Sequence, residues 1–299
     1  MDPLQDPVTY AIPFFLLLIG LEVFLSVKDS LGTYELKDSM ANISMGIGSS
    51  IIEILTKTLA FLAFEFLHQF ALFPQLEWQW WVWVLCFFLE DFSFYWHHRL
   101  SHEIRFLWAS HINHHSSQKF NLSVALRQSW GERFYKYFFW LWLPLLGFEP
   151  LMVMTLLSTN LIYQFWVHTE KIDRLGPLEW IFNTPSHHRV HHAVNPIYLD
   201  RNHAGTLIIW DRMFGTFQQE LPEEKPIYGI TENIDTYHPW QIAWHEYVNI
   251  FRELKQPLSW RQKLNLMLRP PGWDPKGNHK TARALRERFR SKESTAVSE

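Results

Sequence analysis

Cysteine and classical recognition motifs are scarce in this chain. Cys86 is the single cysteine among 299 residues, so no disulfide can form within the chain and the fold does not depend on an oxidising compartment. A His-Glu-x-x-His pair, typical of zinc hydrolases, is missing. Charged residues make up only 19%, and the basic ones form no nucleic-acid recognition motif, so we expect no nucleic-acid partner.

Aromatic residues, in contrast, are abundant. They reach 17% of the chain, with 16 Trp and 24 Phe, which is typical of a membrane protein with aromatic belts. The mean hydropathy of -0.13 indicates that only part of the chain lies in lipid. The apolar runs predict about four to five membrane helices, the last two forming a hairpin of which one or both arms need not span the bilayer fully. We expect these segments at 11–27, 40–73, 78–96, 134–148 and 151–167.

The first apolar run resembles a signal peptide in position but not in its flanks. Asp2 and Asp6 precede it where a signal peptide carries basic residues, and no small-residue cleavage site follows. We therefore interpret it as a first membrane helix that stays in the mature protein.

Histidines between residues 98 and 192 form three clusters. Their spacings are i, i+4 in the first and i, i+3, i+4 in the other two, which on a helix places imidazoles on one face. Neutral imidazole binds Fe, Zn, Cu and Ni, and so many nitrogens favour two ions over one. The candidate ligands are His98, His102, His111, His114, His115, His188, His191 and His192.

The other histidines carry weaker signals. His97 and His187 sit beside a cluster but are rotated by about 100° on a helix, so we interpret them as neighbours of the site rather than ligands. The roles of His168 and His203 stay open. We interpret the remaining histidines as ordinary: His68, His238, His245 and His279.

Asp91 lies within the apolar run 78–96, where a charge is costly. It precedes His98 by two helical turns and shares its face. We predict that Asp91 accepts a hydrogen bond from a ligating imidazole and so orients it. The alternative is a helix-end charge that reaches water.

The C-terminal part contains no membrane-length apolar run. Residues 239–254 predict an amphipathic helix, and the tail 259–299 is rich in Arg and Lys. This tail is either a solvated, partly unstructured end or a surface attracted to anionic lipid. Its basic character places the clusters on the cytoplasmic side. Without an evident retrieval signal, a bacterial inner membrane is favoured over endoplasmic reticulum.

These motifs together resemble the fatty acid hydroxylase/sterol desaturase superfamily of membrane di-iron enzymes. Within it, the chain is most similar to the branch that cleaves glyceryl ethers, the glyceryl-ether monooxygenases. The similarity covers about residues 80–217, inside what we treat as one integral-membrane domain, 1–299. It rests on Asp91-Phe-Ser-Phe-Tyr-Trp-His-His98, Asn183-Thr-Pro-Ser-His-His-Arg-Val-His-His192 and Trp210-Asp-Arg-Met-Phe-Gly-Thr216, among others.

The resemblance implies an all-α membrane fold whose cytosolic cap holds two irons on the eight clustered histidines. It adds Glu103 as a residue of the site, and it makes His168 a candidate further ligand, because relatives carry a histidine after the last membrane segment. His203 departs from the tyrosine usual in this branch, which leaves it as an extra ligand or a replaced aromatic.

The implied activity is insertion of oxygen from O2 into a lipid C–H bond, with cleavage when that carbon adjoins an ether oxygen. The resemblance suggests a tetrahydropterin as reductant. Arg127 and Gln128 follow the second cluster and would contact a lipid headgroup or lie on the surface. Alternatives within the superfamily are hydroxylation or desaturation of a sterol, acyl chain or aminolipid. Two alternatives belong to other classes of protein: a membrane zinc hydrolase and a metal-binding protein. Iron content and O2 dependence would distinguish an oxygenase from both.

Overall fold

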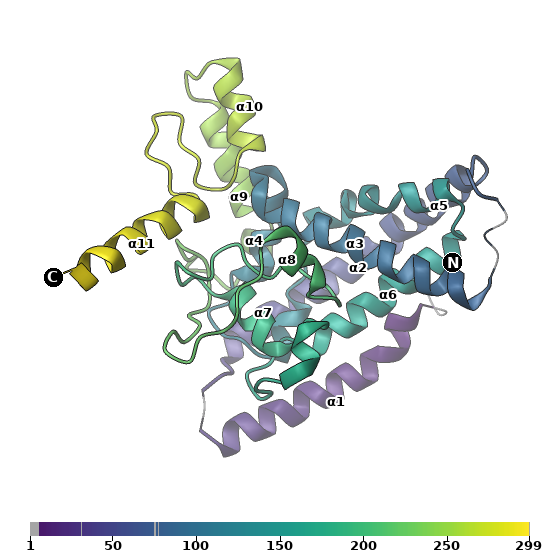
Figure 1. Cartoon of the computed structure of the whole chain (residues 1–299), viewed down its shortest axis with the longest axis horizontal. Helices are drawn as coiled ribbons and strands as arrows, with labels where there is room; N and C mark the ends of the chain where they lie inside the picture. Colours follow the sequence, from purple (N-terminus) through teal and green to yellow (C-terminus); the bar gives the residue numbers. More distant parts are fainter. Residues whose placement is uncertain (1–5, 31, 75, 77, 299) are drawn as a thin grey trace.

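The computed structural model describes residues 6–30, 32–74, 76 and 78–298. Within these ranges the chain is helical and contains no β-strand, only two isolated bridges, which confirms the predicted all-α class. Long helices run side by side, and shorter ones gather at one end of them (Figure 1).

Among the described residues, two helices are long and apolar enough to cross a membrane: α1 (Pro7–Lys28) and α2 (Leu36–His68). Helix α1 begins where the Asp6 side chain accepts a hydrogen bond from the amide of Val8 and Pro7 occupies its first turn. Its apolar side chains face outward, as lipid contact requires, and Leu17 is 68% exposed. We predicted about four to five membrane segments, and those beyond α1 and α2 stay a prediction.

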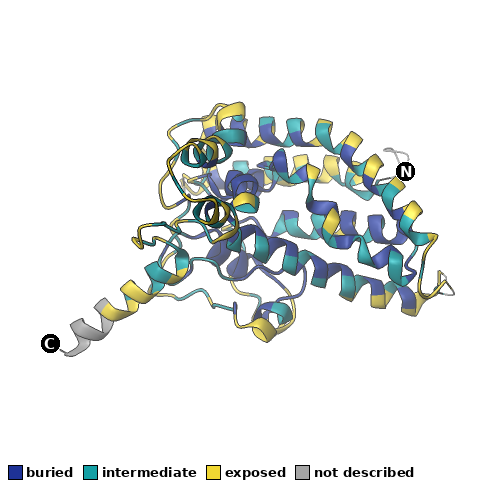
Figure 2. Cartoon of the chain, turned by 90° about the horizontal axis from the view of Figure 1, so that it is seen from above, coloured by how far each residue is buried: buried dark blue, intermediate teal, exposed yellow. Residues whose placement is uncertain are grey.

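Helices α3 (Trp80–Glu103) and α6 (Pro150–Trp166) complete the set of long helices. Helix α6 packs against both α2 and α3, around an apolar core that includes Phe64, Trp140 and Met152. Figure 2 shows buried residues on the inner faces of the long helices and exposed ones along their outer faces. Helix α3 runs on past the apolar segment, so its last turns carry histidines.

The predicted hairpin arm 134–148 is not one continuous helix. The chain there forms η3 (Gly131–Phe134), η4 (Lys136–Trp140) and α5 (Trp142–Leu146). Gly147 ends α5 with φ 122°, where a Cβ would lie 2.2 Å from the carbonyl oxygen of Phe73. The segment therefore folds back onto the end of α2 instead of crossing alone.

The remaining helices form a cap at the end where α1, α3 and α6 finish and α2 begins. We use "the cap" for residues 104–132 and 167–291 (Figure 1). Its elements are α4 (Arg105–His115), η2 (Leu122–Leu126), η5 (Gly176–Trp180), α7 (Pro185–His192), α8 (Ile209–Phe214), α9 (Pro239–Leu254), α10 (Trp260–Leu268) and α11 (Ala282–Ser298).

Helix α9 matches the amphipathic helix predicted at 239–254. Its inner face packs Ile242 and Ala243 against Ala41 and Met45 of α2. The tail beyond residue 259 is not an unstructured end, since it forms α10 and α11. Ser259 and Gln262 cap α10 reciprocally, which explains why a helix starts in so polar a sequence.

Candidate metal centre

Nine buried histidines form two groups where the long helices meet the cap. In each group the candidate ligand atoms lie within 4.8 Å of one another. We call the first the five-histidine group: His98, His102, His111, His115 and His191. We call the second the four-histidine group: His114, His168, His188 and His192.

The five-histidine group draws on three helices. His98 and His102 lie one turn apart at the end of α3, and His111 and His115 lie one turn apart on α4. The Nε2 atom of His111 is 2.9 Å from that of His98 and 3.2 Å from that of His115. His191 completes the group from α7. The helical repeat therefore accounts for four of its members, and the packing of α7 adds the fifth.

The four-histidine group is assembled from more distant parts of the chain. His114 comes from α4, His168 follows α6, and His188 and His192 lie one turn apart on α7. Nε2 of His168 is 3.1 Å from Nε2 of His114 and 2.9 Å from Nε2 of His188. Phe120 covers this group with its ring centroid 5.1 Å from that of His192.

In four of the nine imidazoles the opposite ring nitrogen, Nδ1, faces an oxygen acceptor. Three imidazoles direct Nδ1 at a backbone carbonyl and one at a carboxylate: His98 at His203 O (2.7 Å), His168 at Gln164 O (2.7 Å), His191 at Arg201 O (2.9 Å) and His102 at Asp200 Oδ1 (3.2 Å). A proton on Nδ1 leaves the Nε2 lone pair free for a metal ion.

The electrostatics of both groups suit metal ions. Burial and the neighbouring imidazoles lower the pKa of His115, His188 and His192 well below the usual value, so these rings are neutral near pH 7. Where both rings carry their proton on Nδ1, the facing Nε2 lone pairs repel each other unless a cation lies between them. Nε2 of His102 and Nε2 of His191 are buried without any hydrogen-bond partner, as expected of atoms aimed at an ion.

Asp91 does not play the role that we predicted. Its carboxylate accepts hydrogen bonds from the amides of Thr206 (2.8 Å) and Leu207 (3.0 Å) and from the indole of Trp210 (2.9 Å). Among the described residues none of its hydrogen bonds involves an imidazole. Asp91 therefore ties α3 to the loop that follows His203. An aspartate two turns from a ligand shares its face but is too far along the helix to reach its ring.

Three other predicted residues lie outside both groups. Glu103 pairs with Arg99 at 2.8 Å and is partly exposed, so its role stays a prediction. Arg127 is buried, which excludes the surface position that we allowed for it. Its guanidinium donates to the carbonyl of Asn113 (3.0 Å) and the side chain of Asn42 (2.8 Å) instead of facing a headgroup.

Gln128 lines a small polar cavity of about 40 Å³ between α2, α3 and α6, together with His97 and Glu132. His97 is buried beside the site, as predicted: its Nε2 is 3.6 Å from the Glu132 carboxylate. The same carboxylate is 3.5 Å from Nδ1 of His111. His203 places its ring 5.0 Å from that of His102 but belongs to neither group.

Asp200 and Glu132 are the residues of the site that our sequence reasoning missed. Asp200 has a left-handed backbone with φ 49°, unusual for a residue other than glycine. This conformation accompanies the contact of its carboxylate with His102. Neither residue lies at a helical spacing from a cluster, so no periodic signal marks them.

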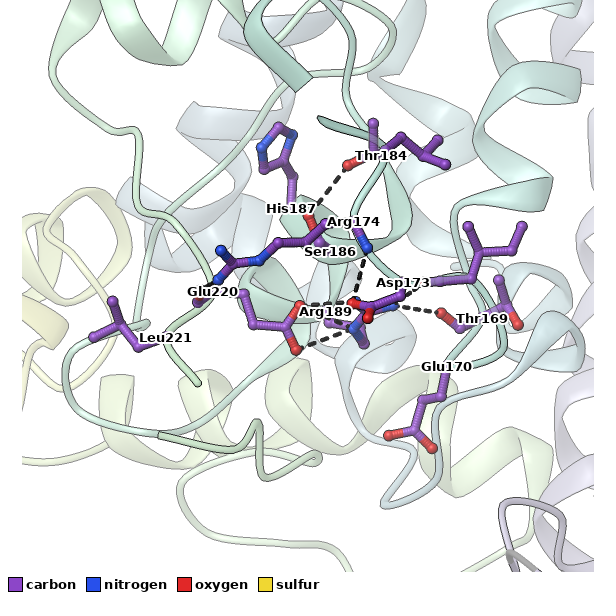
Figure 3. A network of polar contacts seen from close by, with 12 residues as sticks. Thr169, Glu170, Asp173, Arg174, Thr184, Ser186, His187, Arg189, Glu220 and Leu221 are labelled. Carbon is purple, nitrogen blue, oxygen red and sulfur yellow. Dashed lines mark hydrogen bonds and ion pairs between the residues drawn. The ribbon is translucent and has the colours of Figure 1, made fainter. Parts of the chain in front are cut away.

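A buried ion pair holds α7 in place (Figure 3). Arg189, between two candidate ligands, pairs with Glu220 at 2.8 Å and donates to the carbonyls of Thr169 (3.1 Å) and Ile172 (2.7 Å). The guanidinium thus joins α7 to the segment that carries His168. It fixes the position of the four-histidine group.

A pocket of about 490 Å³ opens onto the centre. Its floor includes His102, His115, His191 and His192. Its walls come from α4, from α9 and from the chain between 271 and 285, and they combine aromatic, aliphatic and charged side chains. The tail that we expected at the periphery therefore forms part of the wall beside the candidate metal centre.

The fold and the site together define a class: a helical protein with two candidate membrane helices and two buried histidine groups that could hold metal ions. The model of the fatty acid hydroxylase family matches residues 83–216. The matched region contains all three histidine clusters, and it agrees with the resemblance to this family seen in the histidine motifs.

Relatives with the same name match nearly the whole chain. It is 38% identical over 276 residues to alkylglycerol monooxygenase of Xenopus tropicalis, covering 92% of this chain and 61% of that protein. It is 40% identical over 270 residues to alkylglycerol monooxygenase of Danio rerio, covering 90% and 60%. The chain thus spans about three fifths of the length of these relatives. No solved structure matches it.

Proposed function

We propose that the protein is a membrane monooxygenase that inserts one oxygen atom from O2 into a lipid C–H bond and cleaves glyceryl ether lipids. The observation that carries the proposal is the pair of buried histidine groups, which sits beside a pocket and at the end of candidate membrane helices. The names of the relatives, alkylglycerol monooxygenases, favour ether cleavage over other hydroxylations.

Two iron ions are the proposed cofactors. The nine histidines would hold them, the five-histidine group one and the four-histidine group the other. All-imidazole ligation suits iron but also other transition metals, so the assignment rests on the family. When bound, the irons supply O2 activation. The chain itself keeps the imidazoles neutral, points Nε2 inward and excludes bulk water.

The proposed substrate site is the pocket above the histidines. Its aliphatic and aromatic walls, among them Trp108, Ile112 and Ile234, would hold the start of an alkyl chain. Its polar side chains, among them Asn249 and Asp274, would bind glycerol hydroxyls. This arrangement would place the carbon next to the ether oxygen over the histidines, and positioning of this kind contributes much of the rate. The headgroup role of Arg127 is not proposed again, because that side chain is buried elsewhere.

The reaction balances with a two-electron donor. One oxygen atom enters the C–H bond next to the ether oxygen, and the other leaves as water with two electrons and two protons. The product is a hemiacetal, whose C–O bond breaks to give an aldehyde and a free glycerol hydroxyl. We propose a tetrahydropterin as the donor because of the resemblance to the glyceryl-ether-cleaving branch.

We further propose that residues 1–299 work as one integral-membrane unit with the centre on the cytoplasmic side. The tail contributes to the wall of the pocket, which supports one unit rather than a core with a dispensable end. The basic tail supports the orientation. A bacterial inner membrane is the proposed location.

Lipid mass spectrometry under 18O2 tests the activity. Membranes containing the chain receive an alkylglycerol and a tetrahydropterin, and borohydride is present to trap the aldehyde before its oxygen exchanges with water. We expect a fatty alcohol that carries one 18O and unlabelled glycerol. His111→Ala serves as the inactive control, and His238→Ala, at an exposed histidine, serves as the matched control.

Other outcomes would name a different reaction. A labelled lipid that stays intact would indicate a hydroxylase, and loss of two hydrogens without label would indicate a desaturase. Product that forms without O2 in a zinc-containing protein would overturn the proposal in favour of a hydrolase.

A further inference from the structure

The outer face of α9 and α10 is apolar, aromatic and exposed. Trp240 is 62% exposed, Phe251 60% and Trp260 77%. Val248, Leu264 and Leu268 are exposed beside them. The inner face of the same α9 packs on α2 and lines the pocket, so the helix has two distinct apolar sides. We call the exposed side the α9–α10 face.

Aromatic rings connect this face to a candidate membrane helix. The Trp130 indole donates to the carbonyl of Met45 in α2 at 3.0 Å. The Trp130 ring lies 6.2 Å from that of Trp240, which lies 5.8 Å from that of Trp244. Gly48 allows this approach, because a Cβ there would lie 2.5 Å from the Trp130 ring. The exposed apolar surface of α2 therefore continues onto α9.

Basic residues accompany the apolar ones. Arg252 and Lys255 on and after α9, and Arg261 and Arg269 on and after α10, are exposed. Lys255 also lies 4.3 Å above the ring of Phe251. Exposed tryptophan beside arginine and lysine is the composition of helices that lie in the plane of a bilayer surface with anionic headgroups. A water-facing helix would carry polar side chains at these positions.

We propose that the α9–α10 face lies in the headgroup region of an anionic membrane, on the cap side, and forms a second membrane contact beside the spanning helices. The proposal rests on the membrane placement proposed above. It seats the pocket wall formed by α9 at the bilayer surface, so a lipid substrate reaches the pocket without crossing water. The ligand class is anionic phospholipid, bound by aromatic insertion and basic side chains.

Single fluorescent labels on the full chain test this contact. Cys86→Ser removes the buried native cysteine, and one cysteine is then placed at Phe251 or Leu264 on the face. Leu17 in α1 reports insertion of the spanning helices, and Glu287 on α11, which points away from the long helices in Figure 1, is the water control. Each labelled protein is reconstituted into vesicles of phosphatidylcholine with or without phosphatidylserine, containing lipid quenchers at shallow or deep positions.

We expect labels at Phe251 and Leu264 to shift to the blue and to lose most of their emission to the shallow quencher. Phosphatidylserine should increase this loss, and Lys255→Gln with Arg261→Gln should remove the increase. The Leu17 label should respond to the deep quencher and the Glu287 label to neither.

Three results would overturn the proposal. If the labels at Phe251 and Leu264 are not quenched while the Leu17 label is, the α9–α10 face does not contact the membrane. The membrane placement of the spanning helices would then still hold. A blue shift without lipid quenching would indicate that another protein surface covers the face. Quenching that is equal with and without phosphatidylserine would show that anionic phospholipid is not the ligand of this face. If Leu17 itself is not quenched, the membrane placement fails, and this inference fails with it.

Discussion

The two histidine groups look alike in composition but differ in what holds them together. Local helical spacing builds most of the five-histidine group, with paired histidines one turn apart on α3 and on α4. The four-histidine group has one such pair, on α7, and takes its other members from α4 and from the chain after α6. The first therefore depends on local structure, and the second depends on tertiary packing through Arg189.

Loss of a central ligand should have the largest effect. His111→Ala removes the imidazole whose Nε2 approaches both His98 and His115. We expect turnover to fall by at least roughly 100-fold and bound metal to decrease. Product mass spectrometry and elemental analysis measure both, with His238→Ala as the control. Near-normal turnover would remove His111 from the centre.

A substitution in the second group should separate the two ions. His168→Ala leaves three imidazoles in the four-histidine group and the other group untouched. We expect metal content to fall from two ions per chain toward one, and turnover to fall because both ions are needed. His68→Ala, at a histidine far from the centre, is the matched control. Two ions retained in His168→Ala would show that His168 is not a ligand.

Breaking the Arg189–Glu220 ion pair should reduce metal binding by the four-histidine group more than by the five-histidine group. Arg189→Met leaves the partly buried Glu220 and the carbonyls of Thr169 and Ile172 without their donor, which costs about 1–3 kcal/mol of stability. Thermal unfolding and metal content report the effect, and Arg189→Met with Glu220→Leu should recover part of the stability. Equal metal loss from both groups would contradict the difference that we draw between them.

The smallest effect should come from replacing Asp200, the hydrogen-bond acceptor beside the five-histidine group. Asp200→Ala removes the oxygen that faces Nδ1 of His102, and such outer contacts usually change affinity or activity by about 10–100-fold. Asp200→Asn keeps an acceptor and should lie between wild type and Ala. Metal titration measures the series. An unaffected Ala variant would show that helix packing alone orients His102.

The same difference between local structure and long-range packing explains which features the sequence predicts. The i, i+4 spacings predicted the clusters and their helices, and apolar length predicted α1 and α2, because both signals are local. The pairing of clusters into two groups could not be read from spacing, because it mixes residues from α3, α4 and α7.

The errors share a physical cause as well. Asp91 and Arg127 were interpreted from their neighbours in sequence, but each has partners far along the chain, in the loop after His203 for Asp91 and in α2 for Arg127. The arm at 134–148 was interpreted from hydropathy, which does not register the fold-back at Gly147. Asp200 and Glu132 carry no periodic signal at all, since loop geometry and long-range packing alone bring them to the centre.

The order of the histidines along the chain bears on how the protein is made. His98 to His115 leave the ribosome well before His188 to His192, a delay of several seconds at about 5–20 residues per second. During that interval the early imidazoles have no partners from α7. The last cluster to be synthesised contributes to both groups, so neither metal site can close until the chain has passed His192.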